Sequence, residues 1–176
     1  MATFPTSPAA SYGISKTSRP NVKRVRFADG FEARISFGMH PNAKTWNPTW
    51  ENITEAEADT IEAFLDARAN DADSFSWIPI DLSKWAASTT YFLGDIVQPL
   101  TAQNNGLVFK VTAVSGSSPY TSNSSEPTWP TSGTVTDNEI TWTAMSYEWL
   151  CLDWSKQINV AGYATITATF EEVFEP

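Results

Sequence analysis

One segment of this chain has the periodicity of a helix, and it strongly constrains the fold class. Thr54–Glu57 matches a capping box, in which the Thr54 hydroxyl accepts from the third helical amide and Glu57 reaches back. Apolar residues then recur at helical spacing and define one face, which we expect to be core rather than a partner site. The sequence predicts an amphipathic helix over about 54–70 that ends near Asn70, with an apolar face made of Ala58, Ile61, Phe64 and Leu65.

Most other regular segments alternate with the period of two that is typical of strands. Residues 22–27 and 31–37 flank the turn Ala28-Asp29-Gly30 and predict a β-hairpin. In the last strand, Ala164, Ile166, Ala168 and Phe170 share one face, and threonines occupy the other. The sequence thus predicts a mainly β fold with one α-helix, whose further strands lie at 44–52 (interrupted by Pro48), 74–79, 148–156 and 163–174.

The middle of the chain, residues 81–146, has a different character. It is rich in Ser, Thr, Asn and Pro, and strand-like pieces at 96–97, 107–114 and 139–143 alternate with turns. We interpret it as a small β module inserted into a loop of a parent domain made of residues 22–80 and 147–176. Residues 1–21 hold three prolines and no sustained period, so we expect an extended N-terminal arm that orders only against a neighbour.

Charge is distributed unevenly along the chain. The formal net charge is −9, which argues against a protein whose main task is to hold duplex DNA. Seven of the eleven basic residues nevertheless lie in the first quarter of the sequence, and later segments are acidic. This asymmetry fits a body with one positive and one negative face, through which stacked rings could meet. A solvated basic strand edge explains it equally well.

The residues of most enzyme and metal sites are missing from the sequence. Cys151 and His40 each stand alone, so neither an intrachain disulfide nor a nucleophile–base relay can form, and we expect a buried inert thiol and a structural histidine. Zinc has no Cys/His ligand set, and Asp29, Asp71 and Asp73 do not match an EF-hand loop, although calcium is not excluded. We therefore expect no enzyme and no cofactor.

Targeting and membrane signals are also missing. The first ten residues lack the charged-then-apolar pattern of a signal peptide, and no apolar run approaches about 20 residues. We expect a soluble protein that is not exported through a cleaved signal and does not insert into a membrane.

Two separated stretches of the chain resemble a known family. The first runs from Val25-Arg26-Phe27-Ala28-Asp29-Gly30-Phe31-Glu32-Ala33-Arg34 through the predicted helix to Ser74-Phe75-Ser76-Trp77-Ile78-Pro79. The second begins at Tyr147-Glu148-Trp149 and ends with the strand 165–174. Together, residues 20–80 and 147–176 resemble the minor tail protein M family of lambda-like bacteriophages. The central module is a departure from the family pattern.

The resemblance implies a tail-tube-like β-sandwich with a flanking helix and a structural role in the virion of a long-tailed phage. It implies a ring of six copies at the tail tip, made in the bacterial host cytoplasm, whose partners are the tail tube protein, other tip proteins and the tape-measure protein. DNA would pass through the lumen without specific binding, and an acidic lumen would suit that passage. We predict that a ring or inter-ring interface uses the early basic residues Arg24, Arg26, Arg34 and Lys44.

The central module suggests an alternative function, which is host adhesion through a carbohydrate-binding module displayed on the virion. It is similar to small modules recurrent in phage tail proteins, and its front half to chitin-binding-type modules. Sugar rings stack on exposed aromatic faces. Core packing is the competing interpretation for Trp85, Trp142 and Phe109, whereas Trp129, between Pro127 and Pro130, is the best candidate for an exposed ring. The possible glycan-binding residues are Trp85, Tyr91, Trp129 and Trp142.

A tail-associated wall-degrading enzyme is the third alternative. A glycosidase needs two carboxylates placed across a scissile bond, and pairs such as Glu171-Glu172 have no context that suggests one.

Overall fold

A computed structural model describes residues 1–28, 30–36, 38, 41–100 and 106–174 of the chain. Within these residues the protein has thirteen strands and one helix, so it is mainly β with a single α-helix, as the sequence predicts. The chain divides into two compact units. We call Met1–Phe4 with Phe75–Tyr147 the central unit, and Pro5–Ser74 with Glu148–Pro176 the flanking unit. The predicted domain limits stay a prediction.

The flanking unit is built on an antiparallel sheet. β12 (Glu148–Val160) and β13 (Tyr163–Val173) form a long hairpin, and β13 also pairs with β5 (Lys44–Asn47) and β6 (Thr49–Thr54). β5 pairs in turn with β2 (Ser15–Ser18), so the order within this unit is β12-β13-β5-β2. Pro48 separates β5 from β6, because it has no amide hydrogen for a ladder bond. The predicted interruption at Pro48 is confirmed.

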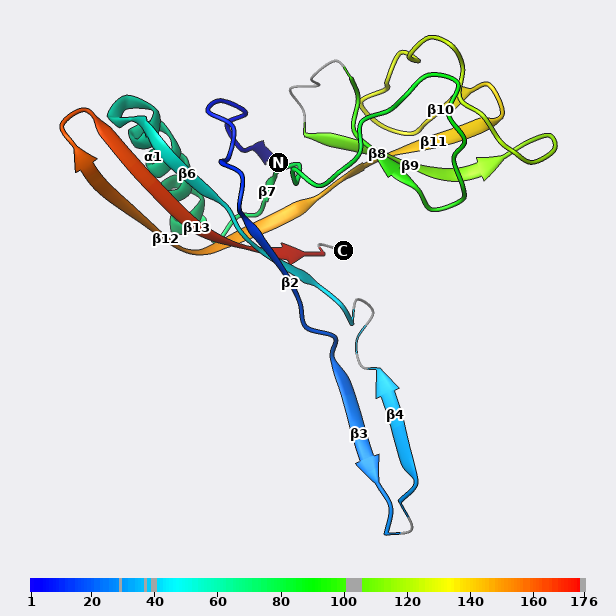
Figure 1. Cartoon of the computed structure of the whole chain (residues 1–176), viewed down its shortest axis with the longest axis horizontal. Helices are drawn as coiled ribbons and strands as arrows, with labels where there is room; N and C mark the ends of the chain where they lie inside the picture. Colours follow the sequence, from blue (N-terminus) through cyan, green and yellow to red (C-terminus); the bar gives the residue numbers. More distant parts are fainter. Residues whose placement is uncertain (29, 37, 39–40, 101–105, 175–176) are drawn as a thin grey trace. The chain divides into compact units, whose positions relative to one another are not determined.

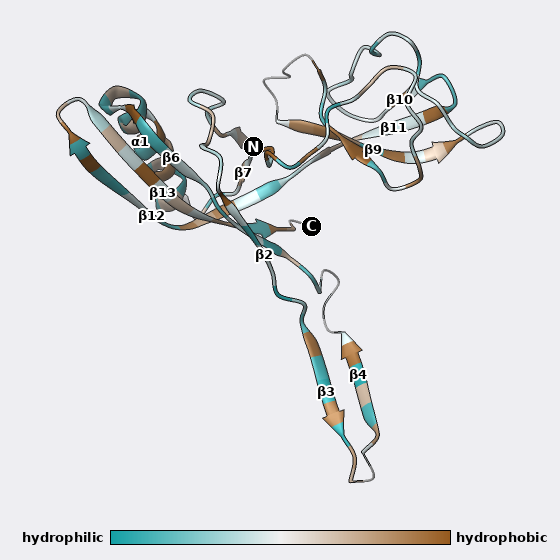
Figure 2. Ribbon diagram, in the orientation of Figure 1, coloured by the Kyte–Doolittle hydropathy of each residue, from teal (hydrophilic) through white to brown (hydrophobic). Residues whose placement is uncertain are grey.

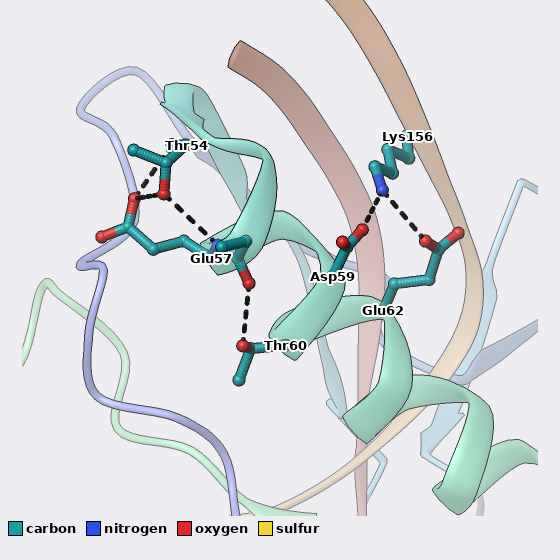
Figure 3. Close-up of polar contacts among 7 residues, drawn as sticks. Thr54, Glu57, Asp59, Thr60, Glu62 and Lys156 are labelled. Carbon is teal, nitrogen blue, oxygen red and sulfur yellow. Dashed lines mark hydrogen bonds and ion pairs between the residues drawn. The ribbon is translucent and has the colours of Figure 1, made fainter. Parts of the chain in front are cut away.

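The helix α1 (Glu55–Asp71) begins at the predicted capping box. The Glu57 amide donates to Thr54 Oγ1 at 3.3 Å, and Glu57 Oε2 accepts from the Thr54 amide at 2.9 Å (Figure 3). The helix ends at Asp71, one residue later than predicted, and its C-cap Ala72 adopts a left-handed conformation with φ 54°. Its amide bonds to the Ala69 and Arg68 carbonyls, and Arg68 also pairs with Asp73 at 3.0 Å. These contacts extend the last turn beyond Asn70.

One face of the sheet is covered by α1. Ala58, Ile61 and Leu65 of the helix are fully buried, as are Ala164 and Ile166 of β13. An ion-pair cluster connects the helix to β12, where Lys156 Nζ contacts the carboxylates of Asp59 and Glu62 (Figure 3). The hydrogen bond that Lys156 donates to Asp59 is the main reason that the pKa of Lys156 is raised. The predicted apolar helix face is thus core at Ala58, Ile61 and Leu65, whereas Phe64 is only partly buried.

The central unit contains a four-stranded antiparallel sheet with the order β10-β11-β9-β8. Its strands are β8 (Ile96–Val97), β9 (Leu107–Val114), β10 (Thr134–Asp137) and β11 (Ile140–Ser146). The sequence predicts β8 and β9 with these bounds and most of β11, but not β10, which is short and mostly polar.

The first 21 residues correct one expectation. β1 (Ala2–Thr3) pairs in parallel with β7 (Phe75–Ser76) inside the central unit, and β2 pairs with β5 inside the flanking unit. These segments are therefore ordered by contacts within the chain, and the expected arm that orders only against a neighbour is wrong for them. Backbone amide and carbonyl groups can bond along the edge of a strand whatever the side chains are. Short polar segments such as β1 and β2 can therefore pair with β7 and β5.

β3 (Val22–Arg26) and β4 (Glu32–Ser36) form a two-stranded sheet of their own, as predicted (Figure 1). The turn is closed by the Phe27 amide, which donates to the Phe31 carbonyl at 2.8 Å, and Gly30 adopts φ 85° within it. Every residue of β3 is exposed, including Val22 and Val25.

Candidate functional site

The face of the flanking sheet that points away from α1 is lined with hydroxyl groups. Along β13, Thr165, Thr167 and Thr169 alternate with the buried residues and lie on the opposite face, as the sequence predicts. Thr167 Oγ1 and Ser155 Oγ lie 2.8 Å apart, and Asn159 Nδ2 donates to Thr165 Oγ1 at 2.8 Å. Cross-strand polar bonds of this kind hold the side chains in a regular array, which we call the open face.

Charge on the open face is entirely acidic. Glu171 and Asp153 lie on it by register, because Glu171 continues the alternation of the threonines and Asp153 pairs with Thr169. Both residues are exposed. Among the strand-paired positions that the structure describes, those on this face carry no Lys or Arg. Leu150 pairs with Glu171 there, and the polar neighbours are Ser15, Thr17, Thr45, Asn47, Thr49, Ser155 and Gln157. The open face is therefore a hydroxyl-rich surface of negative charge.

The β3–β4 hairpin has two chemically different faces. Arg24 pairs across the strands with Arg34, and Arg26 with Glu32, so these side chains share one face. Glu32 accepts from Arg34 Nε at 2.8 Å and from Arg26 Nε at 3.4 Å. The hydrogen bond from Arg34 is the main reason that the pKa of Glu32 is lowered. We call this the basic face.

The other face of the hairpin is apolar. Val25 pairs with Ala33, and Lys23 pairs with Ile35. Val25 is 48% exposed, Phe27 54% and Ile35 53%. Hydrophobic and hydrophilic residues alternate along β4 (Figure 2), whereas β3 has two valines among three basic residues. A two-stranded ribbon with an uncovered apolar face is marginally stable by itself, so this face suits a contact.

Lys44 lies away from the other three predicted interface residues. It is in β5, where its amide donates to Glu172 Oε2 at 3.0 Å and its Nζ donates to Ser18 Oγ at 2.9 Å. The structure thus brings Arg24, Arg26 and Arg34 together on one hairpin, and uses Lys44 within the sheet. Their part in an interface stays a prediction.

The four possible glycan-binding residues are all in the core of the central unit. Trp85, Tyr91, Trp129 and Trp142 are between 0% and 7% exposed and belong to one buried cluster. The expectation that Trp129 is an exposed ring is wrong. Its ring centroid lies 4.2 Å from that of Phe109, and its Nε1 donates to Glu126 at 2.8 Å. The flanking prolines therefore border a buried side chain, and the described cluster offers no aromatic platform.

Comparison with known proteins identifies the family to which this chain belongs. No family model matches the chain. Over 83 residues the chain is 31% identical to tail tip protein M of Escherichia phage lambda, and the match covers 43% of this chain and 74% of the lambda protein. The chain belongs to the tail tip protein M family. This finding confirms the resemblance to a phage tail protein family, whereas the resemblance of the central module to carbohydrate-binding modules stays a prediction.

The residues considered above as catalytic or metal-binding candidates can be placed in this member of the tail tip protein M family where the structure describes them. No group of three or more Cys, His, Asp or Glu side chains there could hold a metal ion. Burial raises the pKa of the Cys151 thiol to about 11, which makes it a poor nucleophile. Asp29 and His40 lie outside the described residues. No described helix is long and apolar enough to cross a membrane.

Sequence reasoning did not identify two candidate functional surfaces of this tail tip protein M relative. The threonine alternation was visible in the sequence, but the all-acidic charge of the open face depends on the register between β12 and β13. The apolar face of the hairpin was also visible as alternation, but only the structure shows that no described strand or helix covers it.

Proposed function

We propose that this protein is a structural component of the phage tail that forms a ring at the tail tip and encloses the channel. The supporting observation is the open face, because a sheet covered on one side by a helix leaves its second side to water or to a lumen. Membership of the tail tip protein M family gives the location in the virion tail. Neighbouring partners would be the tail tube protein, other tip proteins and the tape-measure protein.

Ring closure would solve a problem that the isolated sheet has. In the flanking unit β2 is an outer strand of the sheet, and outer strands carry unpaired backbone groups that tend to aggregate. If identical copies join around a closed symmetry axis, these edges are shielded and the sheets together form a barrel. We propose six copies, with α1 on the outside and the open face toward the channel.

The chemistry of the open face fits the passage of DNA. Glu171 and Asp153 repel the phosphate backbone, and a surface without Lys or Arg gives DNA no counter-charge to bind. The hydroxyl groups of Thr165, Thr167 and Thr169 keep the face hydrated without fixed positive charge. Such a lining would let DNA slide through without specific binding.

Under this proposal the channel lining is assigned to the flanking unit, and the central unit has no part in it. Host adhesion through it has no support from Trp85, Tyr91, Trp129 and Trp142, because all four are buried. Adhesion therefore stays a prediction of the sequence resemblance.

Charge reversal on the open face tests the proposal in assembled phage. Glu171→Lys combined with Asp153→Lys should leave tails assembled but slow DNA ejection, because a basic lining binds phosphate. Asp66→Lys, an exposed position on α1, is the matched control and should eject at the wild-type rate. Unchanged ejection by the double variant in assembled tails would contradict a lumen lined by the open face.

A further inference from the structure

We propose that the apolar face of the β3–β4 hairpin packs against the tip of the β12–β13 hairpin in a second copy of this chain. The inference rests on the proposed ring function and names two surfaces that would meet between its subunits. Each surface is exposed and apolar, and their charges are opposite.

The first surface is the apolar face of β3–β4. Val25, Phe27 and Ile35 are each about half exposed, on a ribbon that pairs only with itself among the described strands. Alternate side chains along a strand lie about 7 Å apart. The ribbon therefore presents a narrow apolar strip that can lie along a protruding edge.

The second surface is the tip of the β12–β13 hairpin. Ile158 is 57% exposed, Val160 67% and Tyr163 51%, and Val160 pairs directly with Tyr163. The Glu55 amide donates to the Gly162 carbonyl at 3.0 Å, which holds the first turn of α1 beside this tip. Ile158 pairs with Ala164 and lies on the helix-side face, whereas Tyr163 continues the threonine face, so the tip exposes apolar side chains on both sides next to an acidic helix start.

Charge determines which partner fits the hairpin. Residues 22–36 carry four basic side chains and two acidic ones, a net charge of +2. Around the tip, residues 54–59 and 156–163 carry three acidic side chains and one basic one, a net charge of −2. Lys23 shares the apolar face with Ile35, so two hairpins packed through these faces would bring like charges together, whereas the acidic surroundings of the tip attract Lys23.

The contact is heterologous, since two different surfaces of the same chain meet. Heterologous contacts join copies head to tail and close into a ring when the rotation permits, whereas a contact between like surfaces would stop at a dimer. The pairing of hairpin with tip is therefore compatible with a ring.

The experiment uses the full chain and two variants that each remove one surface, Ile35→Asp on the hairpin and Ile158→Asp on the tip. In sedimentation velocity at rising concentration, the wild type should self-associate, and each variant should lose association by about tenfold or more. Mixing the two variants should restore a one-to-one heterodimer and nothing larger, because one intact hairpin and one intact tip then remain. Leu93→Asp, an exposed apolar position of the central unit, should associate like the wild type.

The outcomes separate this contact from the ring itself. A wild type that stays monomeric, a mixture of folded variants that stays monomeric, or either variant associating like the wild type would overturn the contact. Incorporation of both variants into tails at the wild-type copy number would also overturn it, while leaving the proposed ring intact. Absence of the wild-type chain from tails would refute the ring, while the heterodimer in solution would still support the contact.

Discussion

Trp85 Nε1 donates a hydrogen bond to the buried carboxylate of Asp137 at 2.8 Å. The same oxygen accepts from Trp142 Nε1 at 3.1 Å, and the other carboxylate oxygen accepts from the Asn123 amide at 2.8 Å. Asp137 is 2% exposed. One side chain therefore satisfies three donors around the aromatic core of the central unit.

Replacing Asp137 should destabilise the central unit strongly. Asp137→Ala leaves two indole donors and one amide without a partner, and each buried unsatisfied group costs about 1–3 kcal/mol. We expect the free energy of unfolding, measured by urea titration, to fall by about 3 kcal/mol or more. Thr136→Ala, exposed on the same strand, should change it by about 0.5 kcal/mol or less. Equal effects of the two substitutions would show that the carboxylate is not central to the core.

Trp129 provides a test that separates core packing from glycan binding. Because the ring is 6% exposed and packs on Phe109, Trp129→Ala should lower the free energy of unfolding by about 3–5 kcal/mol. Phe92→Ala, 60% exposed in the same unit, should cost about 0.5 kcal/mol or less. The interpretation fails if Trp129→Ala keeps wild-type stability but loses binding in a polysaccharide pull-down.

Patterns that act over a few residues were sufficient to predict much of this fold. The capping box at Thr54 and the bounds of β9 depend on neighbours in sequence, and both are found as predicted. The burial of Trp129 depends instead on Phe109 and Trp142, which are distant in sequence and contact it only through tertiary packing. A Pro-flanked tryptophan has the same local sequence whether it is buried or exposed.

The candidate site likewise combines features that the sequence predicts with features that depend on strand pairing. Alternation along β13 places the threonines on one face, but the partners of that face come from β12, whose register has shifts near Asp153 and Ile158. Bulges of this kind cannot be located from one sequence, because they depend on how the two strands pair. β2 was not predicted either, since Ser15–Ser18 is polar and is ordered mainly by its backbone bonds to β5.

The capping box makes stability depend on acid pH. Hydrogen bonds from the Thr54 side chain, and next from its amide, lower the pKa of Glu57 below its ordinary 4.5. The contribution of a carboxylate with a lowered pKa is complete above the unfolded value and is lost as the pH falls through the folded value. Thr54→Ala should therefore cost about 1 kcal/mol at neutral pH.

Below pH 4.5 the stability gap between wild type and Thr54→Ala should narrow, as measured by thermal unfolding across pH 2–7. Thr60→Ala, exposed on the same helix, should show a pH-independent difference. A constant gap for Thr54→Ala would argue against the reciprocal bonds.

The ion pairs of Lys156 should lose their contribution to stability at high pH. Its pKa is raised above 10.5, mainly by the hydrogen bond with Asp59. A group with a raised folded pKa contributes fully below its unfolded value and loses that contribution as the pH rises through the folded one. Lys156→Met should therefore be less stable than wild type at neutral pH, with a gap that narrows above pH 10.5. Lys84→Met, at an exposed lysine, should show little difference at any pH.

A cryo-EM map of the assembled tail tip tests the central claim most directly. It should contain a closed ring of this chain in which Thr165, Thr167 and Thr169 face the channel and α1 lies on the outside. A single copy per tail, or a ring with α1 or the arginines of the β3–β4 hairpin lining the channel, would contradict the proposed function.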